Sequence, residues 1–527
     1  MKYAGLRWVE QRRLQVCLET SIVSCHLGSD RSLTSKSVSS LVWETVSRFG
    51  QQGITLLSTA ILAHLLTPAS YGVMGMASPL INFAATFNDL GIPTAIVQRP
   101  RMGRQALSSL FWANLLFSTV VTLLLFFSAP LVAQFFRKPE VLTVFQVLSL
   151  TFLITGLGNV QHALFYGEMN LRPSAMAQIA SSLAGLIVAV VMAVQGMGVW
   201  SLVGSALVSR VVDTVLMWVL HPWRPLLMLR WDDCRSCIEA GLPLSGFGIV
   251  NFFARNADNL IIGRSLGSTL LGYYQNSYSL MYYPQQTIIM TLANGMLASF
   301  SQVREDIARF RQALLRLSIL VAFVLFPAML GMAATADLIV KVVLGPQWGP
   351  AGPILTILAI AGFLQTVSAP VALAYVPTGN AGVMFRWALV TTTLTVSGFL
   401  VGSFWGITGV AVSYALVQAV LLLPNLFVAL RLIQLPVGTY LRSMVSPFGL
   451  SATMALAVLL WRKVLVMAGF VHPVVLLVSS IVIGGAVYIG LIGFGRPKAV
   501  VDIVDILEST DVGFLRTPLR WLKRRWS

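Results

Sequence analysis

Long apolar stretches follow one another along most of this chain and are separated by short polar gaps. A helix that crosses a bilayer needs about 20 mostly apolar residues, and about fourteen stretches between residues 41 and 494 reach that length. The pattern predicts helices over residues 41–64, 71–97, 107–132, 141–164, 174–195, 198–220, 236–262, 270–298, 314–336, 351–378, 383–402, 406–430, 443–461 and 473–494. We therefore expect an all-α, polytopic membrane protein.

An internal repeat at an offset of 200 residues arranges these helices in two groups. Residues 61–72 align with residues 261–272, with Ile, Leu and Gly at equivalent positions and a basic residue at both His64 and Arg264. Each segment stands near the start of a block of six predicted helices, and both blocks begin on the same side of the membrane. Parallel repeats of this kind are typical of secondary transporters whose substrate site lies between the halves.

The expected organisation is two pseudo-symmetric six-helix lobes followed by two additional helices. The parts are a disordered cytoplasmic extension (1–36), an N-terminal lobe (37–220), a cytoplasmic inter-lobe loop (221–235), a C-terminal lobe (236–430), the two additional helices (431–495) and a basic cytoplasmic tail (496–527). The aromatic and basic residues at the end of the tail suit the surface of the inner leaflet.

The net charge of +17 is explained by membrane topology. Lys and Arg number 36 against 19 Asp and Glu. With the N-terminus inside, the loops on the opposite side hold only six basic residues: Arg137, Lys138, Arg264, Lys341, Arg462 and Lys463. This asymmetry follows the positive-inside rule and predicts that both termini are cytoplasmic. The basic excess suits contact with anionic membrane lipids, and we expect no nucleic-acid partner.

Polar and charged side chains gather in the first two predicted helices of each half. A charge at bilayer depth costs at least about 2.5–3.5 kcal/mol, so such residues usually face a cavity or a partner. The pattern predicts a hydrated central cavity. The cations Arg48 and Arg255 suit an anionic group of a substrate. Uncharged polar candidates that suit sugar hydroxyls are Gln52, Asn256, Asn259, Gln275 and Tyr278.

A purely structural interpretation of these charges stays open. Arg48 lies four residues after Glu44, and Arg255 lies three residues before Asp258, so each Arg could neutralise its own neighbour. Arg210 and Asp213 form a similar pair, which we interpret as structural.

The residues needed for nucleotide, metal or covalent chemistry are missing from the sequence. There is no Gly-Lys pair and hence no phosphate-binding loop of the Gly-x-x-x-x-Gly-Lys type, and there is no His-Glu-x-x-His. Cys234 and Cys237 have the spacing of half a zinc site but no second pair of ligands nearby. We therefore interpret them as reduced thiols. The short outer loops also disfavour a membrane polymerase. We expect no enzyme activity, no metal and no cofactor.

Without a nucleotide site, vectorial transport would draw on an ion gradient or on consumption of the product outside. Asp89 and Asp258 are carboxylates in polar helices of opposite halves. Asp258 lies close to Arg255, which favours a structural role. Asp89 has no basic residue in the preceding turn and is the better proton- or sodium-responsive candidate.

Four segments together resemble a known family. They are Ser47-Arg-Phe-Gly-Gln-Gln-Gly53, the run from Ile61 to Met76, the run from Asp89 to Arg99, and the run from Asp258 to Tyr274. They are similar to the signature of Wzx-type polysaccharide flippases, within the multidrug/oligosaccharidyl-lipid/polysaccharide exporter superfamily. The resemblance covers about residues 37–495, and the family usually has Arg where this chain has His64.

The resemblance implies a V-shaped pair of six-helix lobes and a lipid-linked oligosaccharide as substrate. The carrier lipid would be undecaprenyl diphosphate, moved from the inner to the outer leaflet of the bacterial cytoplasmic membrane. A polysaccharide polymerase and a chain-length regulator are the implied protein partners. The alternative is a cation-coupled small-molecule exporter of the same superfamily. A drug-cation exporter should have an acidic, aromatic cavity, and Arg48 and Arg255 argue against that.

Overall fold

The computed structural model describes residues 43–88, 102–228, 230, 252, 256–302, 307–375 and 378–495, and almost all of them are helical. Two helices span residues 43–65 and 256–265. The others are α2 (Pro68–Asn88), α4 (Arg104–Phe136), α5 (Glu140–Gly167), α6 (Leu171–Val194), α7 (Val199–Leu220), α9 (Ser268–Gln302), α10 (Ile307–Ile339), α11 (Ala351–Ser368), α12 (Ala381–Ser403), α13 (Gly406–Leu432), α14 (Val437–Met467) and α15 (Pro473–Gly495). Short π and 3-10 segments extend α10 (Val340–Leu344, Pro346–Trp348) and α11 (Pro370–Ala374).

The predicted all-α membrane fold is confirmed. Every predicted span overlaps a helix in the described part of the chain, and ten of these helices are long and apolar enough to cross a membrane. Much of the predicted span 236–262, the end of the span 71–97, and both predicted terminal segments (1–36 and 496–527) lie outside the described residues. The number of crossings therefore stays a prediction at fourteen.

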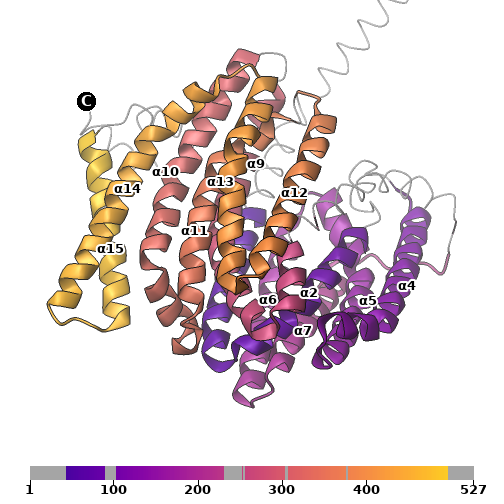
Figure 1. Ribbon diagram of the computed structural model, residues 1–527. Coiled ribbons are helices and arrows are strands. Elements are labelled where there is room, and N and C mark those ends of the chain that lie inside the picture. The colour runs from indigo at the N-terminus through magenta and orange to yellow at the C-terminus, as the bar shows by residue number, and fades with distance from the viewer. Residues whose placement is uncertain are drawn as a thin grey trace, which may run out of the picture.

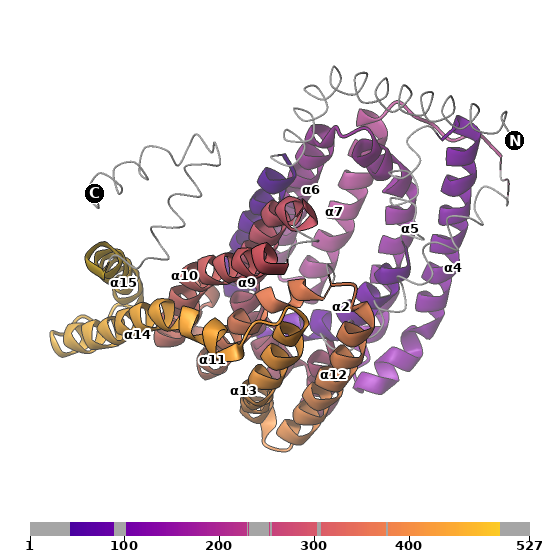
Figure 2. The same ribbon diagram turned by 90° about the horizontal axis from the view of Figure 1, so that it is seen from above.

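The helices form two bundles with α2 and α9 between them (Figures 1 and 2). The first bundle contains α4 to α7, and the second contains α10 to α13. Helices α14 and α15 pack on α10 at the edge of the second bundle, on the side away from the first. This arrangement agrees with two six-helix lobes and two additional helices, which we call the N-lobe, the C-lobe and the α14–α15 pair.

Helices α2 and α9 pack closely through the repeated glycines of the two halves. They begin at Pro68 and Ser268, which are 200 residues apart. A Cβ atom on Gly72 would lie 1.7 Å from the carbonyl oxygen of Ser268, and one on Gly272 would lie 2.0 Å from that of Pro68. Only glycine allows the two backbones to approach this closely. The glycines of the sequence repeat thus lie where the two lobes meet, at the axis that relates them.

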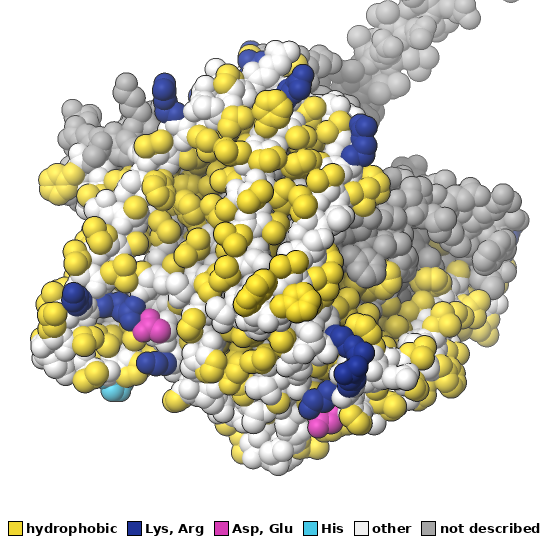
Figure 3. All heavy atoms as spheres, viewed as in Figure 1, with side chains coloured by type: hydrophobic (Ala, Val, Ile, Leu, Met, Phe, Trp, Pro, Cys, Tyr) yellow, Lys and Arg dark blue, Asp and Glu magenta, His cyan; other side chains and the backbone are white. Residues whose placement is uncertain are grey.

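An apolar belt crosses the face of the molecule shown in Figure 3. In Figure 3 the hydrophobic side chains cover the middle of the visible face, and Lys and Arg lie towards its two ends. Large side chains of α12, α13 and α14 are exposed within this belt, among them Leu400, Phe427 and Leu456. Lipid-facing helices show this distribution because lipid hydrocarbon solvates apolar side chains, so burying them against protein brings no hydrophobic stabilisation.

Candidate functional site

The N-lobe contains a cavity of about 640 Å³ with a charged lining. Helices 43–65, α2, α5, α6 and α7 all contribute to its wall. The polar lining residues are Gln51, Ser78, Asn82, Thr151, Thr155, Asn159, His162, Tyr166, Gln178, Ser181, Ser182, Ser209, Arg210 and Asp213. A cavity this polar inside a membrane bundle suits a hydrated substrate group or an ion.

Asp213 and His162 form a hydrogen-bonding contact within this cavity. Nε2 of His162 lies 2.8 Å from Oδ2 of Asp213, and both side chains are mostly buried, with 23% and 16% exposed. The other carboxylate oxygen, Oδ1, is buried without a hydrogen-bond partner among the described residues. The pair joins α5 to α7. Asp213 therefore contacts His162 on a neighbouring helix, a partner that the sequence did not suggest.

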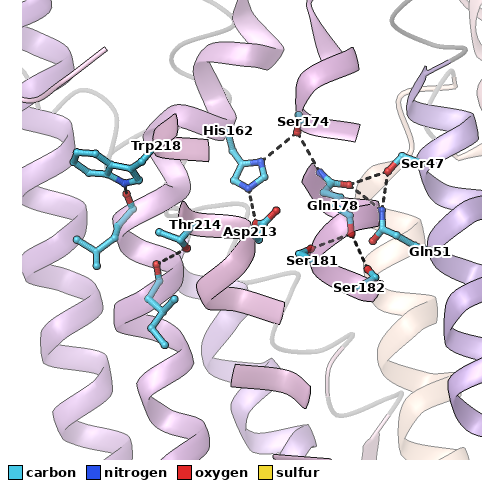
Figure 4. A network of polar contacts seen from close by, with 12 residues as sticks. Ser47, Gln51, His162, Ser174, Gln178, Ser181, Ser182, Asp213, Thr214 and Trp218 are labelled. Atoms are coloured by element: carbon cyan, nitrogen blue, oxygen red, sulfur yellow. Dashed lines mark hydrogen bonds and ion pairs between the residues drawn. The ribbon is translucent and has the colours of Figure 1, made fainter. Parts of the chain in front are cut away.

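A chain of polar contacts runs from this pair to the first helix (Figure 4). Ser174 on α6 lies 3.5 Å from Nδ1 of His162 and accepts a hydrogen bond from Gln178. The side-chain oxygen of Gln178 accepts hydrogen bonds from Gln51 and Ser47, at 2.9 and 3.2 Å. One polar network thus connects four helices, so a change at any member affects the packing of all of them.

Two further side chains of α7 fix that helix against α5. The hydroxyl of Thr214 donates to the carbonyl oxygen of Ile154 at 3.0 Å, and Nε1 of Trp218 donates to that of Leu157 at 2.7 Å. Residues 214 and 218 share one face of α7 because they are four positions apart. These contacts, also drawn in Figure 4, hold Asp213 opposite His162.

The C-lobe contains a second cavity, of about 460 Å³, with an uncharged lining. Helices α9, α11, α12 and α13 form its wall. The polar and aromatic lining residues are Tyr278, Tyr282, Gln285, Gln286, Gln365, Ser368, Tyr375, Trp387, Thr391, Thr392, Thr395, Tyr414, Gln418 and Asn425. No Asp, Glu, Lys, Arg or His is among the described residues that line it. The two lobes thus share a fold but differ in the chemistry of their cavities.

Both cavities lie in the same half of the membrane-spanning bundle, and the opposite half is closed. Trp348 is fully buried at the closed end, where Tyr71 of α2 and Tyr273 of α9 contact it edge-on at 5.3 and 5.8 Å between ring centroids. Its indole nitrogen donates to the carbonyl oxygen of Ala63 at 2.9 Å. By the predicted topology this end faces outward. We call the inter-lobe contacts at this end the outer closure.

Among the described residues, the hydrogen bonds of the outer closure all run from the C-lobe to helix ends of the N-lobe. The side-chain amide of Gln347 in the C-lobe donates to the carbonyl oxygens of Ala63 and Leu66, at the end of the first helix. Nη1 of Arg264, also in the C-lobe, donates to the carbonyl oxygen of Phe135 at the end of α4, at 2.6 Å. Carbonyls at a helix end lack partners within the helix, and here the opposite lobe supplies them.

The predicted substrate residues are only partly brought together. Tyr278 lines the C-lobe cavity. Arg48 is 58% exposed and bonds to Glu44 at 2.7 Å, as the structural interpretation expected. Gln52, four residues after Arg48 on the same helix, has a buried amide nitrogen without a hydrogen-bond partner among the described residues. Gln51, and not Gln52, lines the N-lobe cavity.

The remaining predicted residues lie at several places. Asn256 donates to the carbonyl oxygen of Phe252, four residues earlier, and the side chain of Gln275 lies against Gly75 of α2. Asp258 is buried and accepts a hydrogen bond at Oδ1 from the backbone N–H of Asn259. Arg255 and Asp89 lie outside the described residues. No cluster suited to a metal ion occurs in the part of the chain that the structure describes.

Sequence comparisons assign the chain to a family. Residues 61–353, more than half of the chain, match the family described as polysaccharide biosynthesis protein. The chain belongs to this family. The chain is also 27% identical over 369 residues to the succinoglycan biosynthesis transport protein ExoT of Rhizobium meliloti (strain 1021), covering 69% of this chain and 74% of that protein. It is 24% identical over 428 residues to the lipopolysaccharide biosynthesis protein WzxC of Escherichia coli (strain K12), covering 80% and 86%.

Solved structures show the same fold in more distant proteins. The lipid II flippase MurJ in an inward closed conformation superposes with a TM-score of 0.68 at 14% identity, covering 85% of this chain and 97% of MurJ. An inward-facing multidrug resistance transporter of the MATE family superposes with a TM-score of 0.56 at 18% identity, covering 74% and 98%. The fold is therefore common to flippases and drug exporters. By itself it does not show which of these two activities this polysaccharide biosynthesis protein has.

Proposed function

We propose that this protein is a flippase for undecaprenyl-diphosphate-linked oligosaccharides and that it works by alternating access. The observation that carries the proposal is the pair of polar cavities, one in each lobe, in the half of the bundle opposite the outer closure. A lipid-linked oligosaccharide combines an ionic group with uncharged sugars, and the two cavities offer one charged and one uncharged environment. Relatives named for transport in succinoglycan synthesis and for lipopolysaccharide synthesis support this substrate class.

The membrane and its sides follow from the same proposal. The protein would lie in the bacterial cytoplasmic membrane with both termini in the cytoplasm, because the six basic residues of the outer loops are far outnumbered by those of the inner segments. The carrier lipid and the surrounding membrane lipids are its partners. A polysaccharide polymerase and a chain-length regulator on the outer side would consume the product.

Arg48 and Arg255 are the proposed ligands of the diphosphate, one from each half. A guanidinium has five donors and binds phosphate oxygens in pairs. Arg48 uses two of its donors on Glu44, so a diphosphate would compete with that carboxylate or bind beside it. Arg→Lys keeps the charge but loses the paired geometry and should be partly tolerated.

The experiment is flipping of a fluorescent undecaprenyl-diphosphate glycan in proteoliposomes. The double variant R48A/R255A should lose at least about tenfold in rate, which corresponds to roughly 1.4 kcal/mol, while its thermal unfolding stays as in the wild type. Normal flipping by this variant would remove both residues from the site. Imposed proton or sodium gradients in the same vesicles test the coupling candidates: D89N should lose its response, whereas D258N should keep it.

A small-molecule exporter remains the alternative function, because the fold suits it. An uncharged aromatic cavity would also accept a flat apolar drug. The family match and the named relatives favour the polysaccharide substrate. Accumulation of a drug cation in inverted vesicles, with no flipping of the glycan lipid, would decide for the exporter.

A further inference from the structure

The composition of the C-lobe cavity restricts what can occupy it. A charged group there would find no counter-ion among the described lining residues, and an unpaired charge in such surroundings is costly. The N-lobe cavity offers His162, Arg210 and Asp213 instead. The diphosphate and any acidic sugar are therefore excluded from the C-lobe cavity on electrostatic grounds. An uncharged ligand with both apolar and hydroxyl-bearing faces is the class that remains.

One wall of this cavity is built from stacked tyrosines. Tyr274, Tyr278 and Tyr282 are four positions apart on α9, so they follow one face of the helix. Their rings are nearly parallel, at 17° and 18°, with centroids 6.2 and 5.7 Å apart. Tyr278 and Tyr282 line the cavity. Aromatic faces of this kind pack well against the C–H face of a pyranose ring, because the ring face is electron-rich and apolar.

The cavity wall also presents amides that are already fixed. Asn425 accepts a hydrogen bond from Nε1 of Trp387 at 2.9 Å, which sets the orientation of its amide and leaves its NH₂ group as a donor. Gln365 donates to the hydroxyl of Tyr414, and Gln285 donates to that of Thr366 at 3.0 Å. Pre-oriented amides bind hydroxyls at a lower entropic cost than mobile ones.

One buried polar group in the cavity wall lacks a partner. Tyr375 is only 3% exposed, and its hydroxyl forms no hydrogen bond with any described residue. A buried hydroxyl left without a partner costs about 1–3 kcal/mol. Because Tyr375 lines the cavity, a ligand hydroxyl is well placed to supply the missing bond.

We propose that the C-lobe cavity binds one uncharged sugar of the transported glycan, with its ring face on Tyr278 and Tyr282 and its hydroxyls towards Tyr375 and Asn425. The volume of about 460 Å³ lies in the range of small-ligand sites. The inference rests on the proposed function and refines it. The protein then distinguishes a neutral sugar at this position from an acidic one.

The test measures binding to the full chain in lipid nanodiscs. The probes are undecaprenyl diphosphate alone and the same lipid bearing glucose, galactose, N-acetylglucosamine or glucuronic acid. At least one neutral sugar should tighten binding about tenfold over the bare lipid, and glucuronic acid should not. Y375F removes the hydroxyl that lacks a partner, and W387F removes the N–H that fixes the amide of Asn425. Each should reduce that gain about fivefold, the equivalent of one ordinary hydrogen bond.

W405F is the matched control, since Trp405 is 72% exposed and lines neither cavity, so its change should leave the sugar gain as it is. The proposal is overturned if no neutral sugar tightens binding, if glucuronic acid tightens it equally, or if both C-lobe variants keep the full gain. Failure to bind the bare lipid and to flip any glycan lipid would instead contradict the proposed function itself, so the two failures are distinguishable.

Discussion

At the scale of single residues, the His162–Asp213 pair is the main polar contact buried between α5 and α7. Its geometry fixes the hydrogen-bonding state of the imidazole. If Nε2 donates to the carboxylate of Asp213, then Nδ1 of a neutral ring is the acceptor for the hydroxyl of Ser174. The pair therefore orients the rest of the network that leads to Gln178 and the first helix.

Removing the carboxylate should destabilise the N-lobe. D213A leaves His162 buried without its partner, and we expect a loss of about 1–3 kcal/mol, whereas D213N keeps a hydrogen-bond acceptor and should lose less. The measurement is the apparent Tm in detergent. E168A is the control, because Glu168 contacts His221 at 3.4 Å but is 57% exposed, and exposed pairs contribute little. Equal effects of D213A and E168A would contradict the structural importance of the buried pair.

At the scale of elements, the contact of α2 with α9 allows no side chain at its closest points. We expect G72A and G272A each to force the two helices apart, because the new Cβ would overlap a backbone carbonyl that cannot move independently. A lower Tm, by an amount equivalent to at least about 1–3 kcal/mol, and loss of transport should follow.

G449A is the matched control for these two variants. Gly449 also lies inside a membrane helix, α14, but a Cβ there meets no atom within 4 Å. This substitution should be neutral or slightly stabilising, because alanine favours the helix more than glycine does. If G449A were as harmful as G72A, general intolerance to helix substitution would explain both results, and close packing would not.

The sequence predicted the elements well because lipid imposes a simple rule on them. Apolar length alone located helices such as α6 and α15, and the repeat that pairs position 72 with position 272 predicted the two lobes. The site was harder to predict. Asp213 was assigned to Arg210 by spacing on one helix, while its observed partner, His162, comes from another helix 51 residues away. Spacing along one helix cannot show a pair that forms between two helices. The pair could have been suggested only by noting that two spans that pack together, α5 and α7, each carry a polar residue.

At the scale of the whole molecule, the structure predicts which side of the membrane reaches the cavities. In a background with Cys17, Cys25, Cys234 and Cys237 replaced, S78C places a thiol in the N-lobe cavity. A membrane-impermeant thiol reagent should label it in inverted vesicles and not in intact spheroplasts. Labelling from the outside only would reverse the proposed topology.

Weakening the outer closure should change that pattern. W348A removes a fully buried side chain that contacts both α2 and α9, and Q347A removes only the two bonds to the first helix. Both variants should increase labelling of S78C from the outside, W348A by more. W405A is the control, since Trp405 is 72% exposed and should leave labelling unchanged.

The outer closure also bears on the electrical insulation of the membrane. A protein that moves a bulky substrate must keep small ions from leaking along the same route. Because C-lobe residues hold two separate helix ends of the N-lobe, at Ala63 and at Phe135, separating the lobes at one of these ends strains the contacts at the other as well. The barrier to ions is then lost or kept as a unit. A cell that carries a defect in either set of contacts should therefore show a lower membrane potential before any loss of polysaccharide is seen.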